Sequence, residues 1–267
     1  MEISEIISKS LFVFDFNGTL TVSKNPVDEE MLQYAAKLLE YKEVAIVSGR
    51  DIKYLHNLFI DLLPKDPKLF SRLMILPTYG SAFYKFDPSS MQWTEVYSHR
   101  LSEAEKEKII NAIRESVMKA GFNETPIGEA IEDRHTQIAF SVLGHDAPLE
   151  MKRAWDPDNK KRAIIKGFLT PMLDEYEITI GGPTGIDVNK RGITKGFAIR
   201  QLAEKTGHSL DSMIFIGDAL FEHGNDYPVK ETGIACVEVK DPTHTKRLLK
   251  EVVSALELKY ASEKARL

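Results

Sequence analysis

Residues 11–20 read Leu11-Phe12-Val13-Phe14-Asp15-Phe16-Asn17-Gly18-Thr19-Leu20, in which a continuous apolar run stops at a carboxylate. Apolar residues without alternation are typical of a parallel strand buried on both faces. Open α/β sheets bind their ligands at the carboxyl ends of such strands. We therefore expect Asp15 to lie at a functional edge of an α/β sheet.

The same pattern recurs along the chain. Further buried strands are predicted at residues 44–47, 73–76 and 213–216. Between them, helices are predicted from the region of Pro26 to Leu39 and from Asp51 to Leu63. Strands that alternate with helices favour an open, mostly parallel sheet. The predicted fold class is α/β, with a Rossmann-like parallel-sheet core.

The middle of the chain has a different pattern. Short, half-polar strands are expected at 81–86 and 93–97, followed by a helix that begins with the capping box of Ser102 and Glu105. Further elements are strands at 137–143 and 176–180 and a helix that starts at Asp156-Pro157. We expect the parallel pattern to return after Gly185. The prediction is an α/β core of residues 1–81 and 185–267, split by an inserted α+β cap of residues 82–184.

Composition excludes several classes of protein. Of 267 residues, 43% are hydrophobic and 28% charged, which is ordinary for a globular chain and excludes disorder. No apolar run approaches the roughly 20 residues of a membrane span. The lone Cys236 excludes an intrachain disulfide and a cysteine zinc cage. A net charge of -5 gives no reason to expect nucleic acid or a membrane surface as partner.

Location and assembly follow as expectations. The first ten residues contain Glu2 and Glu5 and no long apolar segment, so they do not resemble a signal peptide. We expect a cytoplasmic protein that is a monomer or a homodimer. Cys236 is expected to be inert core, and Lys160–Arg162 a solvated helix face.

Three predicted strands end in polar residues, namely Asp15, Ser48 and Asp218, and Lys195 lies at the start of a predicted helix. Each is common in a turn or on a solvated helix, but together they suit phosphoryl transfer. An aspartate can attack phosphorus and form an acyl phosphate. Carboxylates supply the oxygen ligands that Mg²⁺ prefers. A hydroxyl and an ammonium can hold the equatorial phosphoryl oxygens.

These residues resemble the motifs of haloacid dehalogenase-like (HAD) phosphohydrolases. Residues 14–20 are similar to the first motif, hydrophobic-D-x-D-G-T-L, while Ser48 and Lys195 are similar to the second and third. The fourth motif is matched by Gly217-Asp218 with Gly224-Asn225-Asp226. Arg134, Ile180-Gly181-Gly182 and Asp187-Val188 resemble the phosphomannomutase and sugar-phosphatase branch, in subclass IIB.

The resemblance implies roles residue by residue. Asp15 is then the nucleophile, and Ser48 and Lys195 bind the transferring phosphate. Mg²⁺ is held by Asp15, the main-chain carbonyl of Asn17 and Asp218, with Asn225 and Asp226 in support. A phosphorylated sugar is the implied substrate. The residues expected to contact it are Lys24, Gly49, Arg50, Arg134, His145 and Asp187.

Four departures from the family pattern favour a phosphatase over a mutase. Asn17 replaces the second aspartate, which relatives use as general acid and base, a role typically worth about 10²–10⁴-fold. Ser48-Gly49-Arg50 resembles sugar phosphatases rather than the glycine-rich mutase motif. Lys24 and His145 stand where mutases carry arginines for a second phosphate. Gly185 replaces a substrate-binding serine.

Three functions stay open at this point. The first is a Mg²⁺-dependent phosphohydrolase acting on a phosphorylated sugar through a phospho-aspartyl intermediate. The second is a phosphomannomutase-like phosphotransferase. The third is a phosphosugar-binding protein in which Asn17 has weakened catalysis.

Overall fold

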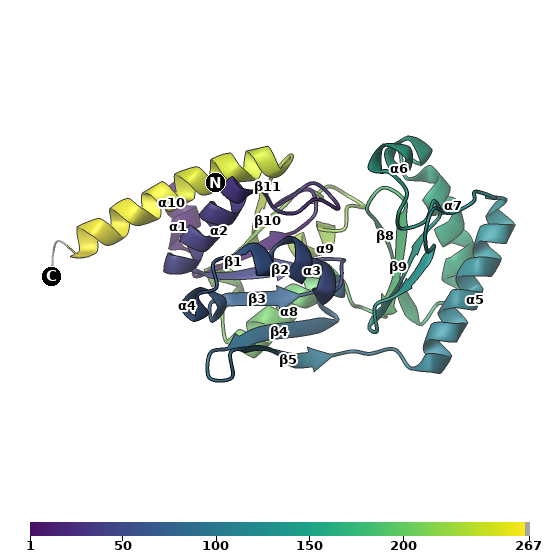
Figure 1. Cartoon of the computed structure of the whole chain (residues 1–267), viewed down its shortest axis with the longest axis horizontal. Helices are drawn as coiled ribbons and strands as arrows, with labels where there is room; N and C mark the ends of the chain where they lie inside the picture. Colours follow the sequence, from purple (N-terminus) through teal and green to yellow (C-terminus); the bar gives the residue numbers. More distant parts are fainter. Residues whose placement is uncertain (265–267) are drawn as a thin grey trace. The chain divides into compact units, whose positions relative to one another are not determined.

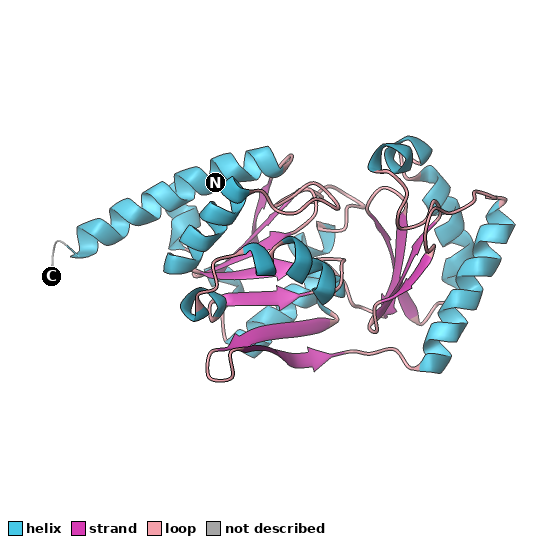
Figure 2. Cartoon of the chain, in the orientation of Figure 1, coloured by secondary structure: helices cyan, strands magenta, loops and turns pink. Residues whose placement is uncertain are grey.

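The computed structural model describes residues 1–264, which form two compact units (Figures 1 and 2). The core unit comprises residues 1–97 together with the described residues from Lys195 onward. The cap unit comprises Ser98–Thr194. An α/β core interrupted by an inserted cap is therefore what the chain forms. No helix in the described part of the chain is long and apolar enough to cross a membrane.

The core unit is built on a seven-stranded sheet in the order β11-β10-β1-β2-β3-β4-β5. The first five strands of this order run parallel, and β4 pairs with β3 in the antiparallel sense. The strands are β1 (Leu11–Asp15), β2 (Glu43–Val47), β3 (Leu73–Leu76), β4 (Ala82–Asp87), β5 (Gln92–Ser98), β10 (Met213–Gly217) and β11 (Ala235–Glu238). The mixed, mostly parallel sheet confirms the predicted fold class.

Helices cover both faces of this sheet (Figure 2). Phe12 and Phe14 of β1 belong to one hydrophobic cluster, and Leu11 and Val13 belong to the other. This two-sided burial is the physical reason for the continuous apolar run. The helices and short 3-10 turns are α1 (Ile3–Ser8), α2 (Glu29–Tyr41), α3 (Ile52–Leu58), η1 (Ile60–Leu62), α4 (Pro67–Phe70), η2 (Thr78–Gly80), α8 (Lys195–Thr206), η4 (Leu210–Ser212), α9 (Tyr227–Lys230) and α10 (Pro242–Lys264).

The cap unit is a four-stranded antiparallel sheet in the order β6-β7-β9-β8. Its apolar face carries Ile138 and Phe140 of β7 and Val188 of β9, which form one cluster with residues of α5 and α7. The alternate positions hold the polar residues Gln137 and Ser141 in β7 and Asp187 and Asn189 in β9. The elements are α5 (Glu103–Ala120), β6 (Ile131–Asp133), β7 (Gln137–Ser141), α6 (Leu149–Trp155), α7 (Lys160–Leu169), η3 (Thr170–Met172), β8 (Tyr176–Gly181) and β9 (Gly185–Lys190).

The unit boundaries differ from the predicted division at 81/82 and 184/185. Strands β4 and β5 extend the core sheet, and β9 belongs to the cap sheet. The half-polar pattern of β5 reflects its place at the edge of the sheet, where most of its residues are partly or fully exposed. In β9, Ile186 and Val188 alternate with Asp187 and Asn189, because only one face of the cap sheet packs against helices.

The prediction of a solvated helix face at Lys160–Arg162 is wrong for Arg162, which is only 1% exposed. Its Nε donates to Asp156 Oδ2 at 2.7 Å, and the guanidinium also donates to the Gly182 carbonyl at 2.5 Å. Asp156 is not the N-cap of this helix. Helix α7 begins after Asn159, and the carboxylate of Asp156 accepts from the main chain of Lys161 and Arg162.

Candidate active site

The predicted site residues of the core unit gather at the carboxyl edge of the sheet. Asp15 ends β1, the central strand that pairs with β10 on one side and β2 on the other. Asp218 directly follows β10, and Ser48 directly follows β2. The chain leaves β1 toward β2 and β3 but returns on the opposite side as β10 and β11, so this edge is a topological switch point.

Lys195 lies at the centre of this group. The first residue of α8, it is fully buried, and its Nζ is 2.5 Å from Asp15 Oδ1 and 2.5 Å from Asp226 Oδ1. Asn225 Oδ1 lies 3.4 Å from the same nitrogen. Burial alone would lower the pKa of Lys195, but attraction to Asp15 and Asp226 outweighs burial and raises the pKa. The side chain is therefore held as an ammonium ion.

Three carboxylates face one another around this lysine. Asp15, Asp218 and Asp226 each offer an oxygen within 4.8 Å of the others. Burial raises the pKa of Asp15 well above its ordinary value; Lys195 acts against this shift, while Asp226 and Asp218 add to it. Burial and the charge of Asp226 also raise the pKa of Asp218. With one ammonium among three carboxylates, the group has an excess of negative charge and suits a hard divalent cation.

The loop after β1 is fitted against Asp218. Thr19 Oγ1 donates to Asp218 Oδ1 at 3.1 Å. Gly18 has a φ of +94°, and a Cβ atom there would lie 2.3 Å from Asp218 Oδ2. A bridge between Asn17 and Thr21 is made by the Phe16 carbonyl and the Gly18 amide. Neither of these bonds uses the Asn17 carbonyl, the predicted metal ligand.

The second motif is also shaped by local contacts. Ser48 is buried and its Oγ accepts from the Arg50 main-chain N–H at 3.1 Å. A Cβ atom at Gly49 would lie 2.7 Å from the ring of Tyr79, whose own φ is +60°. The glycine is therefore required by packing, whatever its predicted contact with substrate.

Tyr54, which sequence reasoning missed, connects three predicted site residues. Its hydroxyl lies 3.1 Å from Asn17 Oδ1 and 2.8 Å from the Lys24 main-chain nitrogen. The Arg50 guanidinium carbon lies 4.2 Å from the centre of its ring. Its position three residues after Asp51, the N-cap of α3, places it in the first turn of that helix. No pattern in the sequence distinguishes it from an ordinary helical tyrosine.

The other predicted substrate residues form a second cluster, within the cap unit. Arg134 donates to Glu132 Oε2 from Nε at 2.8 Å and from Nη2 at 2.6 Å, and to Gln137 Oε1 from Nη1 at 2.7 Å. Asp187 lies 3.6 Å from Nη1, and His145 Nδ1 lies 3.9 Å from Glu132 Oε2. Glu132 was missed, although residues i and i+2 of an extended segment share a face.

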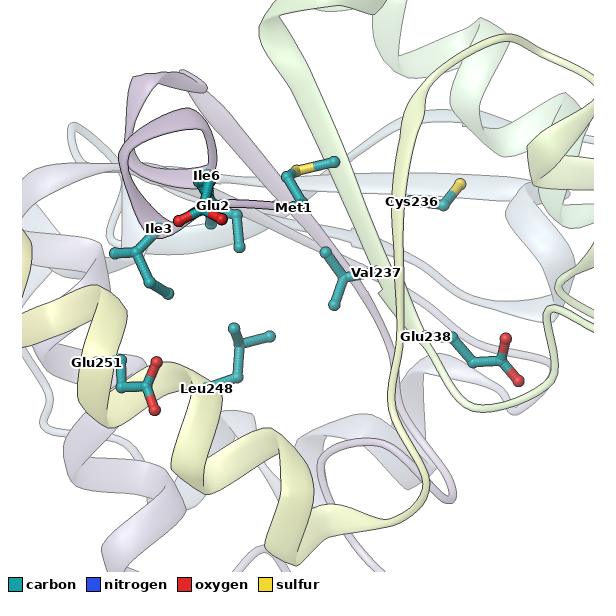
Figure 3. A pocket seen from close by; sticks show the side chains of 9 residues that line it. All are labelled: Met1, Glu2, Ile3, Ile6, Cys236, Val237, Glu238, Leu248 and Glu251. Atoms are coloured by element: carbon teal, nitrogen blue, oxygen red, sulfur yellow. The ribbon is translucent and has the colours of Figure 1, made fainter.

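One pocket of the core unit lies between α1, β11 and α10 (Figure 3). Its volume is about 520 Å³, and Glu2, Glu238 and Glu251 stand among apolar side chains such as Ile6 and Leu248. Cys236 also lines it, and burial raises the pKa of that thiol to about 11. None of the predicted catalytic, metal or substrate residues lines this pocket, so the carboxylate cluster remains the candidate active site.

The fold is one that a class of phosphoryl-transfer enzymes of known structure shares. The structure is similar to that of the IMP-nucleotidase of Plasmodium falciparum, with a TM-score of 0.68 and 17% identity over 94% of this chain and 71% of that one. It is also similar to the trehalose-6-phosphate phosphatase of Aspergillus fumigatus, with a TM-score of 0.55 and 14% identity over 95% of this chain and 98% of that one.

Sequence comparison narrows this class to one family. The family model described as "Eukaryotic phosphomannomutase" matches residues 31–255. A probable phosphomannomutase of Caenorhabditis elegans is 24% identical over 257 residues, covering 92% of this chain and 97% of the relative. The chain belongs to the eukaryotic phosphomannomutase family. It is an enzyme of the haloacid dehalogenase type, a phosphosugar mutase or phosphatase.

The fit between Gly18 and Asp218 yields a first prediction. Gly18→Ala should lower activity about 10²-fold or more, because the new methyl group must displace the Asp218 carboxylate and small misplacements have costs of that size. Gly207→Ala is the matched control, since Gly207 also has a positive φ of +77° but nothing within 4 Å of its Cβ position. Turnover and urea unfolding are measured for both variants. Equal activity in the two would contradict the proposed fit.

Proposed function

We propose that the protein is a Mg²⁺-dependent phosphohydrolase acting on a phosphorylated sugar. One observation carries the proposal: the buried Lys195 ammonium contacts Asp15 at the end of β1, inside a group of three carboxylates. In the reaction, an Asp15 oxygen attacks phosphorus while the bond to the sugar oxygen breaks, forming an aspartyl phosphate. Water then attacks that phosphorus, releases inorganic phosphate and restores Asp15.

The metal site is proposed from charge and donor type. Asp15, Asp218 and the Asn17 carbonyl would hold Mg²⁺, with Asn225 and Asp226 in support. A bound cation would offset the repulsion among the carboxylates and supply positive charge beside the transferring phosphoryl group. Lys195 and Ser48 are proposed to bind the same phosphoryl oxygens. The direct link of Lys195 to Asp15 supports this role for the lysine.

Hydrolysis is proposed over mutase activity because of the cap cluster. A mutase must hold a second phosphate, usually with arginine side chains that make paired hydrogen bonds. Here the Arg134 guanidinium already donates to Glu132 and Gln137 and lies close to Asp187. The two carboxylates offset its charge. Together with Lys24 and His145 in place of arginines, this arrangement favours a substrate with one phosphate.

Phosphomannomutase activity is the second candidate, and family membership favours it. Under either function, Lys24, Gly49 and Arg50 of the core unit and Arg134, His145 and Asp187 of the cap unit are proposed to contact the sugar. A phosphosugar-binding protein with weakened catalysis is the third candidate, since Asn17 lacks a titratable carboxyl group.

The proposed reaction is tested by its products. With mannose 1-phosphate, Mg²⁺ and a bisphosphate activator, we expect mostly inorganic phosphate and little 6-phosphate isomer. Asp15→Ala should abolish turnover, while the exposed control Asp61→Ala should leave it unchanged. Phosphate is measured colorimetrically and the sugar phosphates by ³¹P NMR. Clean isomer formation would favour the mutase, and full activity in Asp15→Ala would remove Asp15 as nucleophile.

The Asn17 position gives a second test of mechanism. Asn17→Asp should raise steady-state turnover by about two orders of magnitude, the usual contribution of one general acid-base group. With an activated aryl phosphate, the protein with Asn17 should show a small burst and then slow turnover, because hydrolysis of the aspartyl phosphate lacks a base. Stopped-flow product release and intact mass of the phosphorylated protein measure both phases.

Deamidation must be controlled in this experiment. Asn17-Gly18 is a sequence prone to deamidation, which would create some aspartate and mimic native activity. Peptide mapping of freshly prepared protein therefore accompanies the kinetics. Turnover by undeamidated protein as fast as that of Asn17→Asp would show that another group supplies the acid-base function.

Binding of Mg²⁺ should stabilise the protein more at neutral than at acidic pH. Because the folded metal-free protein has raised pKa values at Asp15 and Asp218, it binds protons more tightly than the unfolded chain does. Its stability therefore falls as pH rises from about 4 through those folded pKa values. Mg²⁺ should raise the unfolding temperature more at pH 7.5 than at pH 5.5, and less in Asp218→Asn. Calorimetry with and without Mg²⁺ checks this; an equal shift at both pH values would contradict it.

A further inference from the structure

The hydroxyl of Tyr54 has two hydrogen-bonding neighbours, and their chemistry fixes its direction. The Lys24 main-chain N–H can only donate, so the Tyr54 oxygen accepts this hydrogen bond, at 2.8 Å. The hydroxyl hydrogen is then left to donate to Asn17 Oδ1, at 3.1 Å. If the amide were turned over, its NH₂ group would face the hydroxyl and that hydrogen would lose its acceptor.

The ring of Tyr54 is itself held in place. The Arg50 guanidinium stacks over it at 4.2 Å, and the ring of Phe16 meets it edge to face at a centroid distance of 6.1 Å. Its main-chain N–H donates to the Asp51 carboxylate at 2.8 Å. Tyr54 in the first turn of α3 is therefore held by contacts with Arg50 and Asp51, which precede that helix, and with Phe16 in the loop that follows β1.

We propose that Tyr54 is a positioning residue for the reaction, one that turns the Asn17 amide so that its NH₂ group serves as a hydrogen-bond donor to the reacting groups. The inference rests on the proposed function. It assigns to Asn17 a positive role: the side chain cannot transfer a proton, but a correctly turned amide can still stabilise developing negative charge.

The first half of the reaction forms one bond to phosphorus and breaks another. The Asp15 oxygen forms a bond to phosphorus, the bond from phosphorus to the sugar oxygen breaks, and its electron pair stays on that oxygen. The Asn17 NH₂ group donates a hydrogen bond to the leaving oxygen and keeps its own proton. Water supplies the proton that completes the sugar hydroxyl, and the hydroxide left behind takes up the proton released when a second water attacks the aspartyl phosphate. A sugar alkoxide is a poor leaving group and depends on this donor, whereas an aryloxide does not.

The effect of a Tyr54 substitution on activity should therefore depend on the leaving group if Tyr54 positions the Asn17 amide, and should not if Tyr54 only supports the fold. Tyr54→Phe keeps the ring and removes only the hydroxyl. Because kcat/KM reports on the steps up to departure of the leaving group, it should fall about 10-fold or more with a sugar phosphate. With p-nitrophenyl phosphate it should change less than about two-fold. An equal fall with both substrates would overturn the proposal.

A double-mutant cycle tests whether Tyr54 acts through Asn17. In an Asn17→Ala background, Tyr54→Phe should have no further effect on kcat/KM with the sugar phosphate. Multiplicative losses would overturn the proposal. Tyr84→Phe is the matched control, because the Tyr84 hydroxyl donates to Glu95 on the sheet edge, away from the site, and its loss should leave both substrates unaffected.

An NMR measurement that needs no turnover tests the role of Tyr54 independently of the proposed function. In ¹⁵N-labelled protein, Tyr54→Phe should shift or double the side-chain amide signals of Asn17, which Asn17→Ala identifies by their disappearance. Tyr84→Phe should leave them in place. If the unmodified protein turns over neither substrate, the proposed function fails, but the NMR result still decides how the Asn17 amide is oriented. Unchanged Asn17 amide signals in Tyr54→Phe would overturn the proposed role of Tyr54.

Discussion

The ion pairs made by Lys195 hold the core site together. This ammonium, fully buried, lies 2.5 Å from both Asp15 and Asp226. Without it, the buried carboxylates of Asp15 and Asp226 and the partly buried carboxylate of Asp218 would face one another with no internal cation. A buried charge left without its partner typically costs about 3–5 kcal/mol. The same contact places a cation beside the proposed nucleophile. Stability and chemistry therefore depend on one side chain, which a neutral residue of similar size could not replace.

The sequence predicts the parts of this arrangement that leave a local signature. Continuous apolar runs identified β1, β2, β3 and β10, because two-sided burial removes polar residues from a strand. The candidate catalytic residues Asp15, Ser48 and Asp218 were predicted because they lie where those apolar runs end. Asp15 and Lys195 are 180 residues apart. Their chemistry suggested a shared phosphoryl-transfer site, and their match to separate motifs of one family supported it before the structure did.

Features without a local signature were missed or misplaced. Strand β9 alternates polar and apolar residues like many exposed strands, so its place in the cap sheet depends on pairing with β7 and β8. Arg162 reads as a surface residue until Asp156 is seen to pair with it in the interior. Tyr54 and Glu132 are ordinary by type and spacing. Their importance comes from which side chains the fold brings within reach.

The central position of β1 has a consequence for how this molecule is made. Its neighbour β2 follows within 30 residues, but its other neighbour, β10, begins only at Met213, after the whole cap unit. During synthesis on the ribosome, one edge of β1 therefore stays unpaired until most of the chain has been made. Unpaired strand edges promote association with other chains. The carboxylate cluster and its lysine likewise come together only when residues 195–226 arrive. The candidate active site and the pairing of β1 with β10 therefore both form late, after most of the chain has been synthesised.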